Sequence, residues 1–362
     1  MPSSEKVAIT NVRVFDGRRL SEPVTVVIDG PLIGTDPAGA HRIDAHGGVL
    51  LPGLIDSHLH LEGRDTLETL ARYGVTTALD MAFTAPEKLP GLRGLPGLPD
   101  IRSAGLPVIG PNGPHARLPF TPERVILTSA DQAEAFVAAR VADGSDHIKI
   151  VLEAPGEGGP DQDAADALVR AAHAHGRQVV AHAASGGAYL VALDAGADVI
   201  THVPMTPPLS LDPELVKRVA ADGRVVVPTL TMSEGALAAM GHPDALVASI
   251  RVVGLLHQAG VPILAGTDAN AQPGTPYQPP FGESLHHELE LLVEAGLSQA
   301  EALRAATELP ARHFGLTDRG AVTPGLRADL VLVDGDPLAD ISATRAITRV
   351  WCGGQEAVPP RP

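Results

Sequence analysis

Apolar and polar positions follow two different patterns along the chain. Near the beginning, "KVAITNVRVFDG" and "VTVVIDGPLIG" are short apolar runs broken by Gly and Asp, which is typical of strands joined by turns. The stretches "RADLVLVDGDPLADI" and "ITRVWCGG" repeat this pattern near the end. Between them, apolar runs alternate with Ala- and Leu-rich segments of helical periodicity. The pattern predicts a central α/β region flanked by two β-rich ends.

The central region contains repeats of a strand followed by a helix. We predict strands near 53–58, 75–80, 106–110, 147–152, 177–182, 198–202, 224–230 and 261–267. We predict helices over 65–73, 131–142, 163–175, 186–195, 212–222, 244–259, 284–295 and 298–308, and none with clear periodicity in the Pro/Gly-rich stretch 86–102. Eight such repeats imply a parallel sheet, and eight strands close a (β/α)8 TIM-type barrel.

The predicted fold is therefore α/β, with a (β/α)8 barrel over residues 53–315. The chain ends, 1–52 and 316–362, would together form a small β-sandwich domain. An open doubly wound sheet is the alternative fold. Such a sheet normally has a Gly-rich phosphate-binding turn after an early strand, and none follows the first predicted strand here.

Composition narrows the class of protein. The 362 residues are 44% hydrophobic and 19% charged, as in an ordinary globular protein. The formal net charge of −16 disfavours nucleic acid or an anionic membrane as a partner. Cys352 is the only cysteine, so neither an intrachain disulfide nor a cysteine-based zinc site is available. With no signal-like start and no 18-residue apolar run, we expect a cytoplasmic protein that acts on a small molecule; homo-oligomerisation stays open.

The candidate chemistry begins with "LIDSHLHLEG", at the end of the first central strand. Residues i and i+2 of a strand share a face, so His58 and His60 should project together. One such pair is as typical of two ordinary polar side chains as of a metal site.

Four further residues fall at the ends of other predicted strands. Lys149 in "HIKIVL" points inward if the flanking isoleucines pack against helices, and His182 and His202 end "GRQVVAHA" and "ADVITHV". Asp268 follows "VPILAGT". Each residue alone has an ordinary structural explanation, as a hydrogen-bonded strand end, a turn residue or an exposed lysine. Together, four imidazoles and a carboxylate on one face would be costly without a cation, which predicts a metal site.

The order of these motifs resembles the amidohydrolase superfamily. "PGLIDSHLHLEG", "HIKIV", "VVAHA", "ITHVP" and "ILAGTDA" are similar to its metal motifs on strands 1, 4, 5, 6 and 8, and the resemblance extends from about residue 7 to 353. A lysine on strand 4 is similar to the Xaa-Pro dipeptidase and ochratoxinase-like members, which have two metals.

The resemblance implies a full set of ligands. His58, His60 and Asp268 would hold one divalent ion, His182 and His202 the other, and carboxylated Lys149 (N6-carboxylysine) would bridge both. Mixed nitrogen and oxygen ligands suit Zn²⁺, although manganese or iron would fit the same set.

The implied reaction is hydrolysis of a C–N bond in an amide, a dipeptide or N-acyl amino acid, a carbamate or a urea. Two ions would bridge a hydroxide and polarise the substrate carbonyl. Asp268 would be the catalytic base that passes a proton to the leaving nitrogen.

Three alternatives remain. Mononuclear deaminases of the superfamily carry a glutamate two residues after the strand-5 histidine, where this chain has Ala184. Cyclic-amide (imidazolone-like) hydrolases share the tail pattern, but Lys149 favours the two-metal branch. A catalytically inactive scaffold would usually have lost some ligands, and all six are present here.

Three residues are candidate substrate contacts. His115 lies in "IGPNGPHARL", where the dipeptidase-like relatives have a "GGHG"-like turn, and it could equally be a solvated loop histidine. Tyr189 follows strand 5, and Tyr277 lies in the Pro-rich loop after strand 8; loops on that rim form the pockets of barrel enzymes. Tyr189 could instead belong to the core face of its helix. His286 and His287 are weaker candidates, and the "LHHELELL" pattern predicts that one of them faces solvent.

Overall fold

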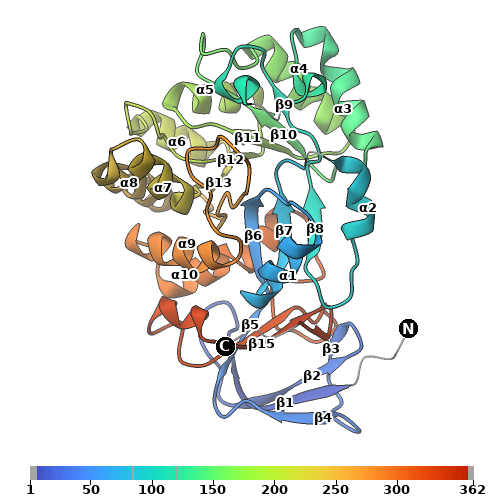
Figure 1. Ribbon diagram of the computed structural model, residues 1–362. Coiled ribbons are helices and arrows are strands. Elements are labelled where there is room, and N and C mark those ends of the chain that lie inside the picture. The colour runs from blue at the N-terminus through green and yellow to red at the C-terminus, as the bar shows by residue number, and fades with distance from the viewer. Residues whose placement is uncertain (1–5, 84, 119–120, 358–362) are drawn as a thin grey trace.

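The computed structural model describes residues 6–83, 85–118 and 121–357 (Figure 1). Strands from both ends of the chain hydrogen-bond into one eight-stranded sheet, ordered β16-β15-β14-β5-β1-β2-β3 with β4 against β1. Its members are β1 (Val7–Val14), β2 (Val24–Asp29), β3 (Leu32–Gly34), β4 (His41–Asp44), β5 (Val49–Pro52), β14 (Leu330–Val333), β15 (Ile347–Cys352) and β16 (Gln355–Glu356).

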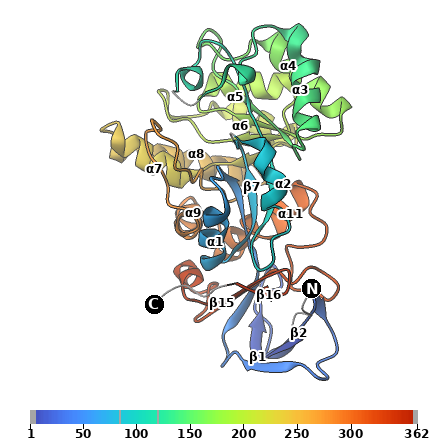
Figure 2. The same ribbon diagram turned by 45° about the vertical axis from the view of Figure 1, so that its right-hand side comes forward.

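This sheet lies at one end of the molecule, as both views show (Figures 1 and 2). An irregularity between Ile9 and Val12 lets β1 belong to two ladders: its first half pairs with β2 and β4, and its last residues pair with β5. The chain ends therefore do come together, as predicted. That they form a separate sandwich domain with the stated boundaries stays a prediction.

The centre of the chain forms two parallel sheets. A three-stranded sheet contains β6 (Leu54–Leu59), β7 (Val75–Asp80) and β8 (Asp100–Ser103). A five-stranded sheet runs through β13 (Val225–Val227), β12 (Val199–Thr201), β11 (Val179–His182), β10 (Ile148–Val151) and β9 (Val108–Ile109). The predicted α/β architecture with parallel sheets is confirmed; closure into a (β/α)8 barrel stays a prediction.

The strand predicted at 261–267 is not a regular strand. The segment 261–269 forms isolated bridges instead, Val226 with Ile263 and Leu59 with Ala269, and so links β13 to β6. Pro262 has no N–H to donate to a ladder. A side chain on Gly266 would lie 2.8 Å from the backbone nitrogen of His58, so the segment passes too close to β6 for a larger residue. The link still joins the two parallel sheets on one side.

Strand β8 was not predicted. Its sequence, "DIRS", alternates polar and apolar residues and follows a Pro/Gly-rich stretch, so it lacks the apolar run of a buried parallel strand. Its polar residues find partners: the Asp100 carboxylate lies 3.0 Å from Arg102 and 2.9 Å from the buried Arg319. These ion pairs stabilise β8 in place of the apolar packing by which a buried parallel strand is recognised in a sequence.

Helices cover the outer side of the parallel strands (Figure 1). They are α1 (Arg64–Arg72), α2 (Leu89–Leu92), α3 (Ala133–Ala142), α4 (Gln162–Ala174), α5 (Gly186–Ala195), α6 (Pro213–Ala221), α7 (Leu230–Ala239), α8 (Leu246–Gln258), α9 (Glu283–Glu294), α10 (Gln299–Ala305) and α11 (Glu308–His313). All eight predicted helices are confirmed, while α2, α7 and α11 were missed. Helix α7, "LTMSEGALAA", has no single polar face, which hid its periodicity. No described helix has the length and apolar character needed to cross a membrane.

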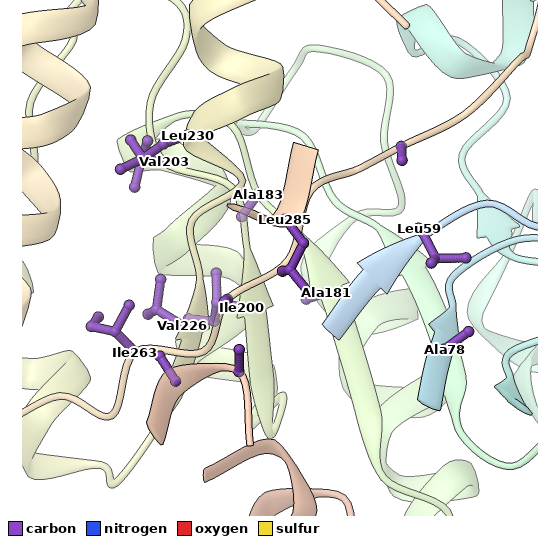
Figure 3. Packing of buried hydrophobic residues seen from close by; sticks show 14 of the residues in the cluster. Leu59, Ala78, Ala181, Ala183, Ile200, Val203, Val226, Leu230, Ile263 and Leu285 are labelled. Atoms are coloured by element: carbon purple, nitrogen blue, oxygen red, sulfur yellow. The ribbon is translucent and has the colours of Figure 1, made fainter. Parts of the chain in front are cut away.

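The main core lies between the parallel strands and these helices. In Figure 3, Ile200, Val226 and Ile263 lie side by side, at the point where β12, β13 and the 261–269 segment meet. All three are at most 3% exposed. Burial of this row fixes the register of the strands and therefore the positions of the residues that follow them.

His286 and His287, adjacent on α9, differ as predicted. His286 is buried, and its ring nitrogens lie 3.0 Å from the Thr344 hydroxyl and 3.0 Å from the Tyr73 carbonyl. Burial lowers its pKa to about 4. His287 is half-buried, 2.7 Å from the Glu234 carboxylate; burial opposes protonation, but hydrogen bonds to Glu234 and Glu290 raise its pKa.

This contrast predicts opposite pH effects on stability. Between pH 6.5 and about 4 the unfolded chain binds a proton that folded His286 rejects, so the native chain loses stability as the pH falls. The free energy of unfolding of the native chain, relative to that of a His286→Gln variant, should therefore fall by roughly 2–3 kcal/mol as the pH falls across that range. Chemical denaturation at a series of pH values measures it. His287→Gln is the matched control: its raised pKa gives the native chain an advantage present at low pH and lost as the pH rises. Equal profiles for the two variants would contradict the assignment.

Candidate metal centre

The six predicted ligands meet at the ends of the parallel strands. His58 and His60 lie at the end of β6, Lys149 within β10, His182 at the last position of β11, His202 directly after β12 and Asp268 in the 261–269 segment. All six line one cavity of about 460 Å³. Carboxyl ends of parallel strands open on the same edge, so residues distant in sequence converge there.

The first group contains His58, His60 and Asp268. The Asp268 carboxylate oxygen lies 2.9 Å from His60 Nε2 and 3.3 Å from His58 Nε2. The possible ligand atoms of the three residues lie within 4.8 Å of one another, close enough to share one ion. Burial alone would raise the pKa of Asp268, but its contacts with the two imidazoles hold the pKa well below its usual range. The carboxylate is therefore ionised across the physiological pH range.

The second pair, His182 and His202, lies beside the first group. The two ring centroids are 4.4 Å apart, and the His202 ring lies 4.9 Å from that of His58. Burial, with the neighbouring imidazoles adding to it, lowers the pKa of both residues well below the usual value. The imidazoles are therefore neutral, which is the form that binds metal. His202 Nδ1 lies 2.8 Å from the Thr229 hydroxyl, so Nε2 is the nitrogen that can bind an ion.

Lys149 lines the same cavity as these groups, so its side chain points inward, as the pattern of its strand predicted. It is 4% exposed, and its Nζ donates a hydrogen bond to the Thr201 hydroxyl at 2.9 Å. Burial lowers the pKa of the amine to about 7, while the Asp268 charge opposes the shift. A substantial fraction of the amine is therefore uncharged and nucleophilic near neutral pH.

The backbone around the ligands is held by buried side chains. His202, Thr229 and Asp268 have φ values of 75°, 51° and 57°, a region that residues other than glycine rarely adopt. The Asp56 carboxylate accepts hydrogen bonds from His58 N at 3.1 Å and from the Thr267 hydroxyl at 2.7 Å, tying β6 to the segment that holds Asp268. These bonds keep the strained positions in place.

A second support lies behind His202. The Glu288 carboxylate accepts hydrogen bonds from the backbone N–H groups of Leu230 and Thr231, at 3.0 and 2.8 Å, and so anchors the first turn of α7. Thr229, which contacts His202, is the residue immediately before that turn. Glu288 therefore fixes the position of one wall of the site, although its own side chain does not line the cavity.

The predicted substrate contacts have three different outcomes. His115 lines the cavity, 4.6 Å from the His182 ring. Tyr189 does not line it: the side chain is fully buried, and its hydroxyl donates a hydrogen bond to the His202 carbonyl at 2.6 Å. Tyr189 therefore supports a ligand strand, which corrects the expected substrate contact. Tyr277 is also absent from the described lining, because its ring lies flat over Gly235 of α7.

Glu153 was not predicted from the sequence. Its carboxylate lies in the cavity, 3.4 Å from His115 Nδ1, and the ligand atoms of His115, Glu153 and His182 also lie within 4.8 Å of one another. The only available signal was its position four residues after Lys149, just beyond a strand end. The sequence also does not distinguish from ordinary core residues the three that hydrogen-bond to the candidate ligands, Asp56, Thr201 and Thr229.

The donor set fits divalent metal ions. The imidazoles of His58, His182 and His202, whose pKa values burial lowers, converge with His60 and the ionised Asp268 on one volume, a combination that Zn²⁺ and related ions prefer. His58 Nδ1 is buried and has no hydrogen-bond partner among the described residues, although a buried polar nitrogen normally has one. Parallel α/β sheets with such a donor set at the strand ends are typical of hydrolases that use metal ions.

Comparisons with known proteins identify the family. The model of the amidohydrolase family matches residues 49–357, and the chain belongs to this family. The chain is accordingly an enzyme that hydrolyses C–N bonds. The resemblance stated from the strand motifs is confirmed.

Individual relatives cover most of the chain. An uncharacterised protein of Mycobacterium tuberculosis is 28% identical over 86% of this chain and 85% of its own length. The imidazolonepropionase of Deinococcus deserti is 26% identical over 93% of this chain and 92% of its own length. Among solved structures, a Xaa-Pro dipeptidase with bound methionine superposes with a TM-score of 0.81 at 23% identity, covering 97% of this chain and 99% of that one. Aspergillus niger ochratoxinase gives 0.80 at 20% identity, covering 99% and 96%. At these identities the two structures show the fold alone.

Proposed function

We propose that this chain is a hydrolase with two divalent metal ions, Zn²⁺ in the first instance, that cleaves an amide, a dipeptide or N-acyl amino acid, a carbamate or a urea. The observation that carries the proposal is the convergence of four imidazoles, Asp268 and Lys149 on the floor of one cavity. His58, His60 and Asp268 hold one ion, and His182 and His202 hold the other. The strands around them close into a (β/α)8 barrel.

Lys149 completes this site as a carbamate. Its uncharged amine adds to CO₂, forms an N–C bond and releases one proton, which leaves a carboxylate on Nζ. That anion replaces an ammonium group that two nearby cations would repel. Nζ is buried beside Thr201, so the carboxylate would form in the same cavity that both pairs of histidines line.

When bound, two divalent cations lower the pKa of water and polarise a carbonyl oxygen. The chain supplies the rest. Asp268 and Thr229 orient the rings of His60 and His202, and the apolar part of the cavity lining limits the water around the reacting bond. Asp268 is ionised and lies beside His58 and His60. It accepts a proton from the attacking water and delivers it to the leaving nitrogen.

The second candidate is a mononuclear deaminase or cyclic-amide hydrolase. One observation favours it: the group formed by His58, His60 and Asp268 is compact enough for one ion by itself. The relative named imidazolonepropionase agrees with this alternative. Metal stoichiometry separates the two proposals.

Protein purified without chelator, or reconstituted with zinc and bicarbonate, should contain about two metal ions per chain. It should hydrolyse at least one compound of a panel of N-acyl amino acids, dipeptides, carbamates and ureas, and dialysis against a chelator should abolish the activity. His182→Asn should reduce the metal content, because it removes a ligand. His173→Asn is the matched control, since His173 is exposed and pairs with Asp198 on the surface. One ion per chain in the native protein, with ammonia or ring-opened products, would favour the second candidate.

A further inference from the structure

The outer wall of the cavity is apolar. Met81, Leu106, Ile109 and Met205 line it from the ends of the parallel strands and the loops that follow. Helix α7 contributes Met232, Ala236 and Met240, spaced four residues apart and therefore on one helical face. Four of the chain's five methionines thus line one cavity. Such a wall binds an apolar group of variable shape, because thioether side chains adapt to what they contact.

Apart from the two metal ions proposed for its floor, the cavity has few charged side chains, and most of them are negative. Among the described lining residues Lys149 is the only lysine or arginine, and it lies at the floor, bonded to Thr201. The carboxylates are Glu153 and Asp268. The remaining polar side chains above the floor, apart from His115, are neutral: Thr121, Thr206, Asn270, Gln272 and Thr275.

This arrangement is unfavourable for an anionic substrate. A buried carboxylate needs a paired cation or several hydrogen-bond donors. His115 already lies beside the Glu153 carboxylate, with 3.4 Å between Nδ1 and the nearer oxygen, so it is not free to pair with a substrate carboxylate. A substrate carboxylate placed above the metal site would therefore meet the Glu153 charge and an apolar wall.

We propose, on the basis of the function proposed above, that the substrate is electrically neutral and carries an aliphatic group that lies along the face of α7 formed by Met232, Ala236 and Met240. Dipeptides and N-acyl amino acids with a free carboxylate are then poor substrates. Neutral amides, carbamates and ureas with an apolar substituent are good ones. The described lining residues include no phenylalanine, tyrosine or tryptophan, so a flexible chain suits the wall better than a flat ring that needs a stacking partner.

The test compares two compounds that differ only in a carboxylate: N-hexanoyl-leucine and N-(3-methylbutyl)hexanamide. The metal-loaded full chain should show a kcat/KM, and a calorimetric affinity, at least about 10-fold higher for the neutral amide. Shortening the acyl group to acetyl removes four methylenes and should lower the affinity by roughly 10- to 100-fold.

A matched pair of variants tests the charge argument. Met240 is 49% exposed at the rim of the cavity, so Met240→Arg adds a cation there without disturbing the core. It should reduce the preference for the neutral compound by roughly 2- to 5-fold. Val247→Arg on α8, at a position that is 69% exposed and outside the lining, should leave the preference unchanged.

Binding separates this inference from the proposed function. If neither compound is hydrolysed but the neutral one binds more tightly, the substrate class holds and the reaction assignment fails for these amides. Equal or tighter binding of the carboxylate compound, or no binding of either, would overturn the inference even in a protein that hydrolyses other C–N bonds.

Discussion

An Asp268→Asn variant should retain most of its metal yet turn over substrate at least about 10²–10⁴-fold more slowly than the native chain. The carboxylate lies 2.9 Å from His60 and 3.3 Å from His58, and its low pKa keeps it ionised. Asparagine preserves the size of the side chain and one oxygen ligand, but it accepts no proton. Turnover under saturating substrate and metal content by elemental analysis, both on the same preparation, measure the effect.

Asp56→Asn is the matched control for this variant. Asp56 is a buried carboxylate two residues before His58, and it supports the backbone without lining the cavity. Its replacement should lower the temperature of unfolding while turnover per bound metal changes far less than in Asp268→Asn. Near-normal turnover in the Asp268 variant would remove this residue from proton transfer.

The convergence of the six candidate ligands on one cavity was predictable because their positions depend on strand ends. Each of His58, His182 and His202 closes an apolar run long enough to identify a buried strand, and parallel strands end on one edge. Asp268 was found by the same reasoning, at the end of the strand predicted over 261–267. Its segment is not a regular strand, but isolated bridges from Ile263 to Val226 and from Ala269 to Leu59 still bring Asp268 to the same edge.

The supporting residues were not predictable in the same way. Tyr189 lies on a helix, α5, that is apolar on most positions, so nothing in the sequence indicates which side chains face the cavity and which face the core. The structure places it in the core. Strand β8 escaped detection because ion pairs with Arg319 stabilise its polar positions, and Arg319 lies more than two hundred residues away in sequence. Contacts of this kind depend on the tertiary fold and leave no local periodicity.

Glu153 shows the same limit at the site itself. A glutamate after a strand end is ordinarily a solvated loop residue. Only the folded chain brings Glu153 beside His115. The charge that the cavity favours in a substrate can therefore be inferred from the structure but not from the sequence.

A Lys149→Ala variant should bind metal at least about 10- to 100-fold more weakly and lose hydrolytic activity, because it removes the bridge between the two pairs of histidines. The same change should leave the fold intact, since the amine makes one hydrogen bond, to Thr201. Lys217→Ala is the control: Lys217 is exposed and pairs with Glu214 on α6, so its loss should affect neither quantity. Metal titration followed by elemental analysis gives the first measurement.

Chemical rescue makes the Lys149 prediction specific to a carbamate. A short carboxylic acid supplied with zinc can occupy the space left by the side chain and provide two oxygens where the carbamate had them, so it should restore part of the activity. An amine of the same size should not.

In the native protein, crystals grown with zinc and bicarbonate should show three additional atoms on Nζ, lying between the two ions. The lowered pKa of the amine makes this reaction accessible near neutral pH, because the uncharged form is the one that adds to CO₂. A bare lysine still bonded to Thr201 beside two bound ions would refute the bridge. The same bare lysine beside a single ion on His58, His60 and Asp268 would place the chain with the mononuclear members of its family.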